Sequence, residues 1–391
     1  MSGVATLAPE AARAFMVGHH GLRQRVRAAG DAAVGEAARA LLTERRCIQL
    51  DPLDVIGTNA DLVALARIDG IARGDVYRHL MPGHAFEHFA KERCLLPATA
   101  FPYYRGQAAE TSWWSHAERM RRLPDGVVEA VLAVVKKHGP LTVPDLEQHG
   151  EWGRVAPIDW SGWKGTAKAA AMALEVLWTR CEVVVAGRSG RGKLWDVPSR
   201  ALGAWGRKKA RASDEFARWA LIERVEAAGL LARNAGPHWS MLSATRTSTL
   251  PEELVAEGVL EEVAVDGAKR TYLAPAGFRE RTFPEDDGDM RVLGPLDSVL
   301  WDRKLVAHAF GFDYVWEVYK PAHTRRFGWY VCPIMHRGQL VARLEARTSE
   351  DALEVTGLWP EAAHKLDRRA LKSALRRHAT ALGKGEVVLP R

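Results

Sequence analysis

Gln49 and Asp51 are the residues whose types and spacing point most directly to chemistry. They flank Leu50 in a short extended segment, Cys47–Asp51, that Pro52 ends. Side chains alternate along an extended segment, so the amide and the carboxylate are expected on one side of it. Together they can hold a water molecule, and the carboxylate can take its proton and stabilise a cationic sugar during N-glycosidic hydrolysis. A structural alternative stays open, because Asp before Pro is a common turn residue and Gln49 can cap a backbone group.

Two histidines offer a weaker chemical pattern. His84 and His88 are four residues apart in a segment, 84–93, that is predicted to be helical, and this spacing can bring two metal ligands together. No Glu follows His84 in the H-E-x-x-H manner, and no third ligand is evident. Four scattered cysteines form no C-x-x-C pair, so reduced thiols are expected. The sequence predicts no metal site.

The glycine-rich segment Gly187–Lys193 matches most of the phosphate-loop pattern G-x-x-x-x-G-K. Leu194 stands where a Ser or Thr should bind magnesium, and the residues after it favour a strand over a helix. We therefore expect no nucleotide cofactor, although ATP use stays a distant alternative. The preferred interpretation is a basic hairpin tip that contacts backbone phosphates through Arg188, Arg191 and Lys193.

Composition limits the class of protein. The chain has 391 residues, 47% hydrophobic and 26% charged, and no apolar run of about 18 residues that would suggest a membrane span. A net charge of +7 favours a polyanionic partner, because Lys and Arg gain affinity by releasing counterions from phosphates. The first residues show no secretory signal and no heptad run calls for a dimer, so a cytoplasmic monomer is expected.

The elements that must position Gln49 and Asp51 are helical on both sides. Helices are predicted over 11–17, 31–46 and 54–68. The middle of the chain then contains two similar units, each a set of helices followed by a hairpin, which is typical of a winged helix. The first has helices at 127–137, 143–149 and 165–180 with strands at 182–186 and 193–197. The second has helices at 214–228 and 252–257 with strands at 260–265 and 269–273, joined by an Asp-Gly turn.

The tail changes character. Strands are predicted at 314–319, 329–334 and 340–346, as in a small antiparallel sheet or barrel. A final helix at 367–382 carries cations that either face solvent or contact phosphates: Arg368, Arg369, Lys372, Arg376 and Arg377. The predicted class is α+β, with tandem winged helices followed by a C-terminal β-barrel. The expected domains are 1–122, 123–205, 206–288 and 289–391.

Segments from both ends of the chain resemble one known family. They are Cys47–Asp51, Leu62–Arg67, Phe86–Ala90, Leu95–Pro97, Leu293–Arg303, Phe310–Tyr314, Glu317–Pro321 and Arg326–Tyr330. The chain is similar in these segments to the winged-helix DNA glycosylases that unhook interstrand crosslinks. The resemblance covers nearly the whole chain and is weakest in the middle.

The resemblance implies a function for these residues. Members have a basic channel for DNA and a Gln-apolar-Gln or Gln-apolar-Asp motif that holds the catalytic water, so Gln49 and Asp51 are expected to be catalytic. The implied activity is monofunctional hydrolysis of alkylated purines such as N7-alkylguanine, including those in crosslinks, in duplex DNA. The expected DNA contacts, in addition to the hairpin tip, are Arg45, Arg46, Lys164, Lys168, Lys320, His323, Arg325 and Arg326.

One departure from the resemblance concerns the residues after Val55. Relatives carry an Arg and a His before the leucine matched by Leu62, where this chain has Thr58, Asn59, Ala60 and Asp61. The missing basic groups put the substrate range and the activity in question. The alternative function is a winged-helix protein that binds DNA without catalysis, as a regulator or a lesion-binding factor.

Overall fold

The computed structural model describes residues 4–108, 114–158 and 166–390. These residues form two compact units. Unit 1 contains residues up to Val76, the short stretch Phe89–Cys94, and everything from Ala220 onward, whereas unit 2 contains Tyr77–His88 and Leu95–Trp219. None of the helices in the described part of the chain combines the length and apolar character needed to span a bilayer.

Unit 1 draws its elements from both ends of the chain. The amino-terminal elements are β1 (Ala5–Leu7), α1 (Pro9–His19), β2 (Val26–Arg27), α2 (Asp31–Arg45), β3 (Ile48–Gln49), α3 (Asn59–Leu65) and β4 (Ile68–Asp69). The later ones are β11 (Leu231–Ala232), α13 (Ser243–Thr247), α14 (Leu250–Ala256), β12 (Leu260–Val265), β13 (Thr271–Pro275), β14 (Arg291–Val292), α15 (Arg303–Phe310), β15 (Val331–His336), β16 (Gln339–Thr348), β17 (Ala352–Pro360), α16 (Arg368–Ala381) and β18 (Glu386–Val388).

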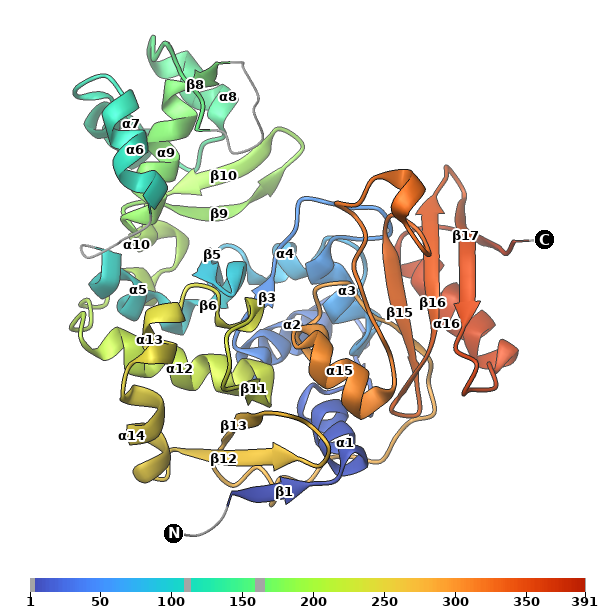
Figure 1. Ribbon diagram of the computed structural model, residues 1–391. Helices are drawn as coiled ribbons and strands as arrows, with labels where there is room; N and C mark the ends of the chain where they lie inside the picture. The colour runs from blue at the N-terminus through green and yellow to red at the C-terminus, as the bar shows by residue number, and fades with distance from the viewer. Residues whose placement is uncertain (1–3, 109–113, 159–165, 391) are drawn as a thin grey trace. The chain divides into compact units, whose positions relative to one another are not determined.

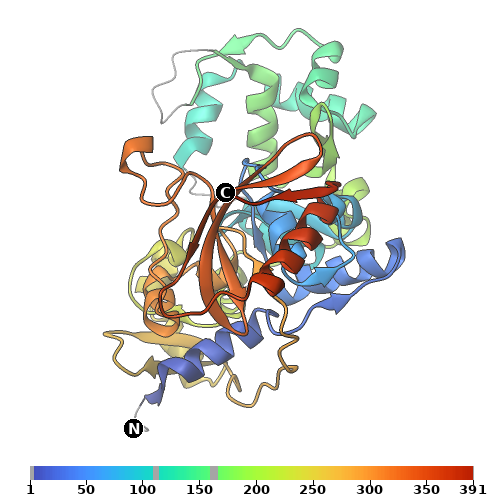
Figure 2. The ribbon, with the colours of Figure 1, turned by 90° about the vertical axis from the view of Figure 1, so that its right-hand side faces the viewer.

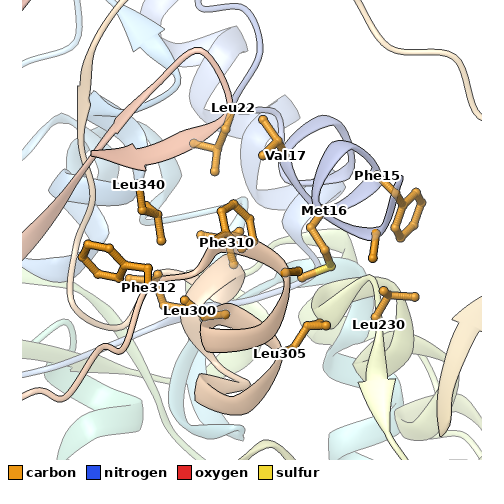
Figure 3. Close-up of a cluster of buried hydrophobic side chains, with 14 of the residues drawn as sticks. Phe15, Met16, Val17, Leu22, Leu230, Leu300, Leu305, Phe310, Phe312 and Leu340 are labelled. Carbon is orange, nitrogen blue, oxygen red and sulfur yellow. The ribbon is translucent and has the colours of Figure 1, made fainter. Parts of the chain in front are cut away.

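Residues far apart in the sequence share one core in unit 1. Strand β1 pairs in parallel with β12 in a sheet of order β1-β12-β13-β11 (Figure 1). Met16 of α1 and Leu305 of α15 lie in the same cluster of buried apolar side chains, together with Leu230 (Figure 3). Buried apolar surface stabilises a fold by roughly 25 cal/mol per Å². Because residues from both ends of the chain share this core, they form one folding unit.

The C-terminal part of unit 1 is a curled five-stranded sheet of order β14-β15-β16-β17-β18 (Figure 2). Strands β14 to β17 pair antiparallel, and β18 pairs in parallel with β17. Helix α16 packs Leu371, Leu375 and Ala379 against the core of this sheet. The α+β class is confirmed, and the expected barrel is a half-barrel whose sheet stays open between its edge strands β14 and β18.

Unit 2 is mainly helical. It contains α5 (Phe101–Gln107), α6 (Trp114–Arg122), α7 (Val127–His138), α8 (Val143–Leu146), β7 (Arg154–Val155), β8 (Ala167–Lys168), α9 (Ala169–Thr179), β9 (Val184–Ser189), β10 (Gly192–Asp196), α10 (Pro198–Ala201) and α11 (Ala204–Arg207). Four further elements contribute residues to both units or adjoin their boundary: α4 (Asp75–Leu80), β5 (Ala85–Ala90), β6 (Glu92–Pro97) and α12 (Glu215–Ala228). Helices α7, α8 and α9 precede the hairpin of β9 and β10, and their assignment as a winged helix stays a prediction.

The helix predicted over 84–93 is wrong. The segment forms β5, which leads into β6 (Glu92–Pro97), and Glu92 has a left-handed backbone with φ of 57°. Phe86 is fully buried, and its ring packs edge-on against Phe101 and Tyr104. Tertiary contacts of this kind outweigh the modest differences in helix propensity between residues. The helical spacing of His84 and His88 as metal ligands is therefore lost.

Two further predictions need correction. The helix expected over 54–68 is restricted to α3, because a capping box of Thr58 and Asp61 sets its first turn. The strand expected over 314–319 is absent: these residues pair with no strand, and 318–319 form a turn. Tyr314 is instead held by a 2.7 Å hydrogen bond from its hydroxyl to the carbonyl of Val331.

Candidate functional site

Gln49 ends strand β3 and is buried, with 8% of its surface exposed. Its side-chain oxygen Oε1 accepts a 2.9 Å hydrogen bond from the ammonium of Lys91. Its backbone carbonyl accepts a 2.8 Å hydrogen bond from the side chain of Asn59. The next residue, Leu50, donates its N–H to the carbonyl of Arg93. Both the backbone and the side chain of Gln49 are therefore fixed in position.

Asp51 lies two residues farther on and is half-buried. Its Oδ1 atom accepts a 2.8 Å hydrogen bond from the N–H of Leu53, which closes a tight turn around Pro52. Burial raises the pKa of Asp51, and the hydrogen bond from Leu53 opposes this only in part. The Asp51 carboxylate also lies within electrostatic range of Tyr319, which is 84% exposed. The carboxylate thus lies near an exposed aromatic ring.

Helix α3 holds the segment that carries Gln49. Thr58 and Asp61 cap its first turn reciprocally, and Asp61 also accepts a 2.9 Å hydrogen bond from the N–H of Gly74. Asn59 links Gln49 to the C-terminal part of unit 1, because its Oδ1 accepts a 3.2 Å hydrogen bond from the N–H of Leu296. The residues that depart from the resemblance therefore support the site structurally.

Lys91 is a buried neighbour of this site that sequence reasoning missed. It follows β5, and 6% of its surface is exposed. Its ammonium lies 5.4 Å from the centre of the Trp301 ring, a distance that suits a cation–π contact. No sequence signal could have found it, because a single lysine in a mixed segment is ordinarily a surface residue.

These groups can do hydrolytic chemistry. A carboxylate with a raised pKa is a better proton acceptor than an ordinary one, and an amide two residues away can hold the water that it deprotonates. Among the described residues, no group of three His, Cys, Asp or Glu side chains is placed to hold a metal ion. Asp51 and Gln49 carry groups of the kinds used in acid–base and electrostatic catalysis.

A family model described as DNA glycosylase AlkZ-like matches residues 42–381, which include Gln49, Asp51 and Lys91. The chain belongs to the AlkZ-like DNA glycosylase family. It is therefore a DNA glycosylase, an enzyme of DNA repair, and DNA is its partner. Among solved structures it is similar to Streptomyces sahachiroi DNA glycosylase AlkZ, with a TM-score of 0.64 and 19% identity, covering 98% of this chain and 99% of that chain. This likeness shows a common fold.

The glycosylase carries four of its candidate DNA contacts on one loop of unit 1: Lys320, His323, Arg325 and Arg326. Glu317, buried at 2% exposure, closes this loop by accepting the backbone N–H groups of Arg326 and Phe327 and the ammonium of Lys320. Burial raises the pKa of Glu317, but these hydrogen bonds outweigh it and hold the value at about 2. His323 is exposed, and Arg325 donates to the carbonyl of Lys320.

The candidate contacts of unit 2 have partners within the glycosylase. Arg188 and Lys193 both pair with Glu87, which is fully buried, and Arg188 also lies over the ring of Tyr77. Arg191 pairs with Asp145. Lys168 lies 3.4 Å from Glu147, and Lys164 lies outside the described residues. Their contacts with DNA stay predictions.

The remaining candidates lie at the C-terminal end of α2 and on the C-terminal helix of unit 1. Arg45 is buried at 7% exposure, and burial lowers its pKa to about 10. Arg46 lies 3.5 Å from the carboxylate of Glu223. On α16, Arg377 pairs with Asp289 at 3.3 Å, whereas the exposed cations are Arg368, Arg369, Lys372 and Arg376. A solvent-facing or phosphate-binding role for these four stays open.

Proposed function

We propose that this glycosylase is monofunctional and hydrolyses the N-glycosidic bond of alkylated purines in duplex DNA. N7-alkylguanine is the proposed substrate, including N7-alkylguanine within an interstrand crosslink. The observation that carries the proposal is the half-buried Asp51 carboxylate, with its raised pKa, two residues from the anchored Gln49. The family supplies the reaction class, and this pair supplies the groups that the reaction needs.

The proposed reaction needs one base and a positioned water. Asp51 takes a proton from the water as the water oxygen bonds to C1′ of the sugar. The C1′–N9 bond breaks, and its electron pair leaves with the purine, where it neutralises the positive charge of the N7-alkylated ring. The Asp51 carboxylate also stabilises the positive charge that develops on the sugar. The products are a neutral alkylated purine and an abasic site.

We further propose that cations hold the duplex through its phosphates, so that recognition depends on damage more than on sequence. The loop closed by Glu317 and the hairpin tip of β9 and β10 are the candidate surfaces. The proposal includes tandem winged helices, with domain boundaries near residues 122, 205 and 288. A monomer and a cytoplasmic location complete it.

The test compares wild-type protein with Asp51→Asn under single-turnover conditions, using duplex DNA that contains N7-alkylguanine. Abasic sites are counted after alkaline cleavage. The substitution keeps the Oδ1 acceptor for the N–H of Leu53, so the turn should survive. The rate should fall by about a hundred- to ten-thousand-fold, the usual contribution of a positioned base, while DNA affinity changes little.

Asp54→Asn is the matched control, since Asp54 lies on the same segment and pairs with Arg73 at the surface. Its rate should stay within about twofold of wild type, as is usual for surface positions. An unchanged rate in Asp51→Asn would remove Asp51 from the mechanism. Tight, salt-dependent binding by wild type without abasic product would instead support binding without catalysis.

A further inference from the structure

The ammonium of Lys91 is buried, and no carboxylate of the described residues forms an ion pair with it. Within the described ranges its polar partner is the side-chain oxygen of Gln49, at 2.9 Å, and its other contact is the ring of Trp301. Burial lowers the pKa of Lys91; among the titratable groups around it Cys94 and Glu92 raise this pKa, whereas Arg224 and Arg303 lower it further. Burying an ammonium without an ion pair costs free energy that an apolar side chain of similar size would not, so packing alone does not account for a lysine here.

The lysine decides how the amide of Gln49 is oriented. An ammonium carries only donors, so the amide oxygen must face it and the amide nitrogen Nε2 must point the other way. That nitrogen donates to none of the side chains or backbone groups described. Two N–H groups are thus left to bind an added molecule. Without the ammonium, the Gln49 amide can rotate so that its oxygen, and not its nitrogen, faces the added molecule.

We propose that Lys91 is a positioning residue for the glycosylase reaction, holding Gln49 so that its Nε2 donates to a lone pair of the attacking water. The other lone pair then stays free to attack C1′, and one proton of the water points to Asp51. This inference rests on the proposed function, because it needs Asp51 to be the base. It assigns the hydrogen-bond roles at the water site: Gln49 donates to the water, and Asp51 accepts from it.

The first experiment measures single-turnover rates for Lys91→Met, which keeps most of the length and apolar volume of the side chain but removes its donors. The rate should fall by on the order of 10- to 100-fold, as for other small misplacements of reacting groups. Lys91→Arg keeps a donor and should lie between Lys91→Met and wild type. Lys304→Met, which removes one exposed charge, is the control and should leave the rate unchanged.

Gln49→Glu separates orientation from packing. The carboxylate keeps its partner in Lys91, so thermal unfolding should occur no lower than in wild type, yet it cannot donate to the water. The rate should therefore fall although the fold is intact. A rate equal to that of wild type would overturn the assignment of Gln49 as donor, and with it the role of Lys91.

A double-mutant cycle with Gln49→Ala tests whether Lys91 acts through Gln49. In the Gln49→Ala background, Lys91→Met should have almost no further effect on the rate. If the fold-decreases in rate of the two substitutions multiplied in the double variant, Lys91 would act independently of Gln49, and the proposal would be overturned. Each comparison includes wild type and Asp51→Asn. If Asp51→Asn reacts as fast as wild type, the result counts against the proposed function. If Asp51→Asn is slow but Lys91→Met keeps the wild-type rate, the result counts against this inference alone.

Two other measurements distinguish positioning from rival roles. DNA affinity and its dependence on salt should be the same in Lys91→Met and wild type, because a buried positioning group releases no counterion from DNA. A weaker affinity with a shallower salt dependence would make Lys91 a phosphate contact. Borohydride trapping of a covalent complex that Lys91→Met abolishes would make Lys91 a nucleophile, and this too would overturn the proposal. Thermal unfolding of each variant verifies that its fold is retained.

Discussion

At the scale of single residues, the site depends on how two side chains are held. Asp51 uses one oxygen to close its own turn with Leu53, and its other oxygen forms no hydrogen bond with the described residues. Gln49 has its oxygen bound to Lys91 and its nitrogen unbound. Each side chain therefore has one atom engaged by the protein and one atom available for a water molecule.

The raised pKa of Asp51 predicts how rate and stability depend on pH. The rate should rise as pH increases through this pKa and level off above it, because only the carboxylate can accept a proton. When the folded-state pKa lies above the unfolded one, stability falls as pH rises from the unfolded value through the folded value. Asp51→Asn should therefore melt at a higher temperature than wild type at neutral pH, and this difference should vanish below the ordinary value of 3.8.

The measurements are single-turnover rates corrected for uncatalysed base loss, and melting curves over the same pH series. A flat rate profile through the acid range would contradict a role for Asp51 as the base. A variant that melts no higher than wild type at neutral pH would contradict the burial cost assigned to its charge.

At the scale of elements, α3 connects the segment of Gln49 and Asp51 to distant parts of unit 1. Asn59 is 1% exposed and satisfies a carbonyl at Gln49 and an N–H at Leu296 with one side chain. The capping box of Thr58 and Asp61 fixes the first turn of α3 and thereby the position of Asn59. A short helix thus fixes the backbone beside Gln49.

Asn59→Ala should lower the free energy of unfolding by about 1–3 kcal/mol, because it leaves buried backbone groups without partners. It should also slow the reaction, because the backbone of Gln49 loses a fixed contact. Chemical denaturation and single-turnover kinetics measure the two effects. Asn234→Ala, at an exposed side chain, should change stability by less than about 0.5 kcal/mol. Equal stability of the two variants would contradict this role for α3.

At the scale of the whole molecule, unit 1 joins the two ends of the chain through a buried ion pair. Arg67 and Asp297 are 3% and 0% exposed, and two hydrogen bonds of 2.7 and 2.9 Å connect them. Arg67 also donates to the carbonyls of His20 and Val63. The pair lies between segments 230 positions apart, which makes the amino-terminal site depend on the C-terminal part of the chain.

Asp297→Asn should lower the free energy of unfolding by about 3–5 kcal/mol, because it leaves the charge of Arg67 buried without its partner. Urea denaturation measures the loss. The double variant Arg67→Met with Asp297→Leu should lose less than the single variant, since no unpaired charge remains. A double variant less stable than Asp297→Asn would show that the hydrogen bonds of Arg67 to the backbone, and not its charge balance, dominate.

The sequence by itself determined what local patterns encode. Periodic apolar residues located α7, α12 and α16, and the Asp-Gly turn located the hairpin of β12 and β13, because these signals act between near neighbours. Gln49 and Asp51 were found from their spacing and from the family resemblance. Tertiary structure decided that 84–93 forms strands, that Lys91 faces Gln49, and that Asn59 connects Gln49 with Leu296. Those contacts join residues 10 to 237 positions apart, and no periodicity along the chain records them.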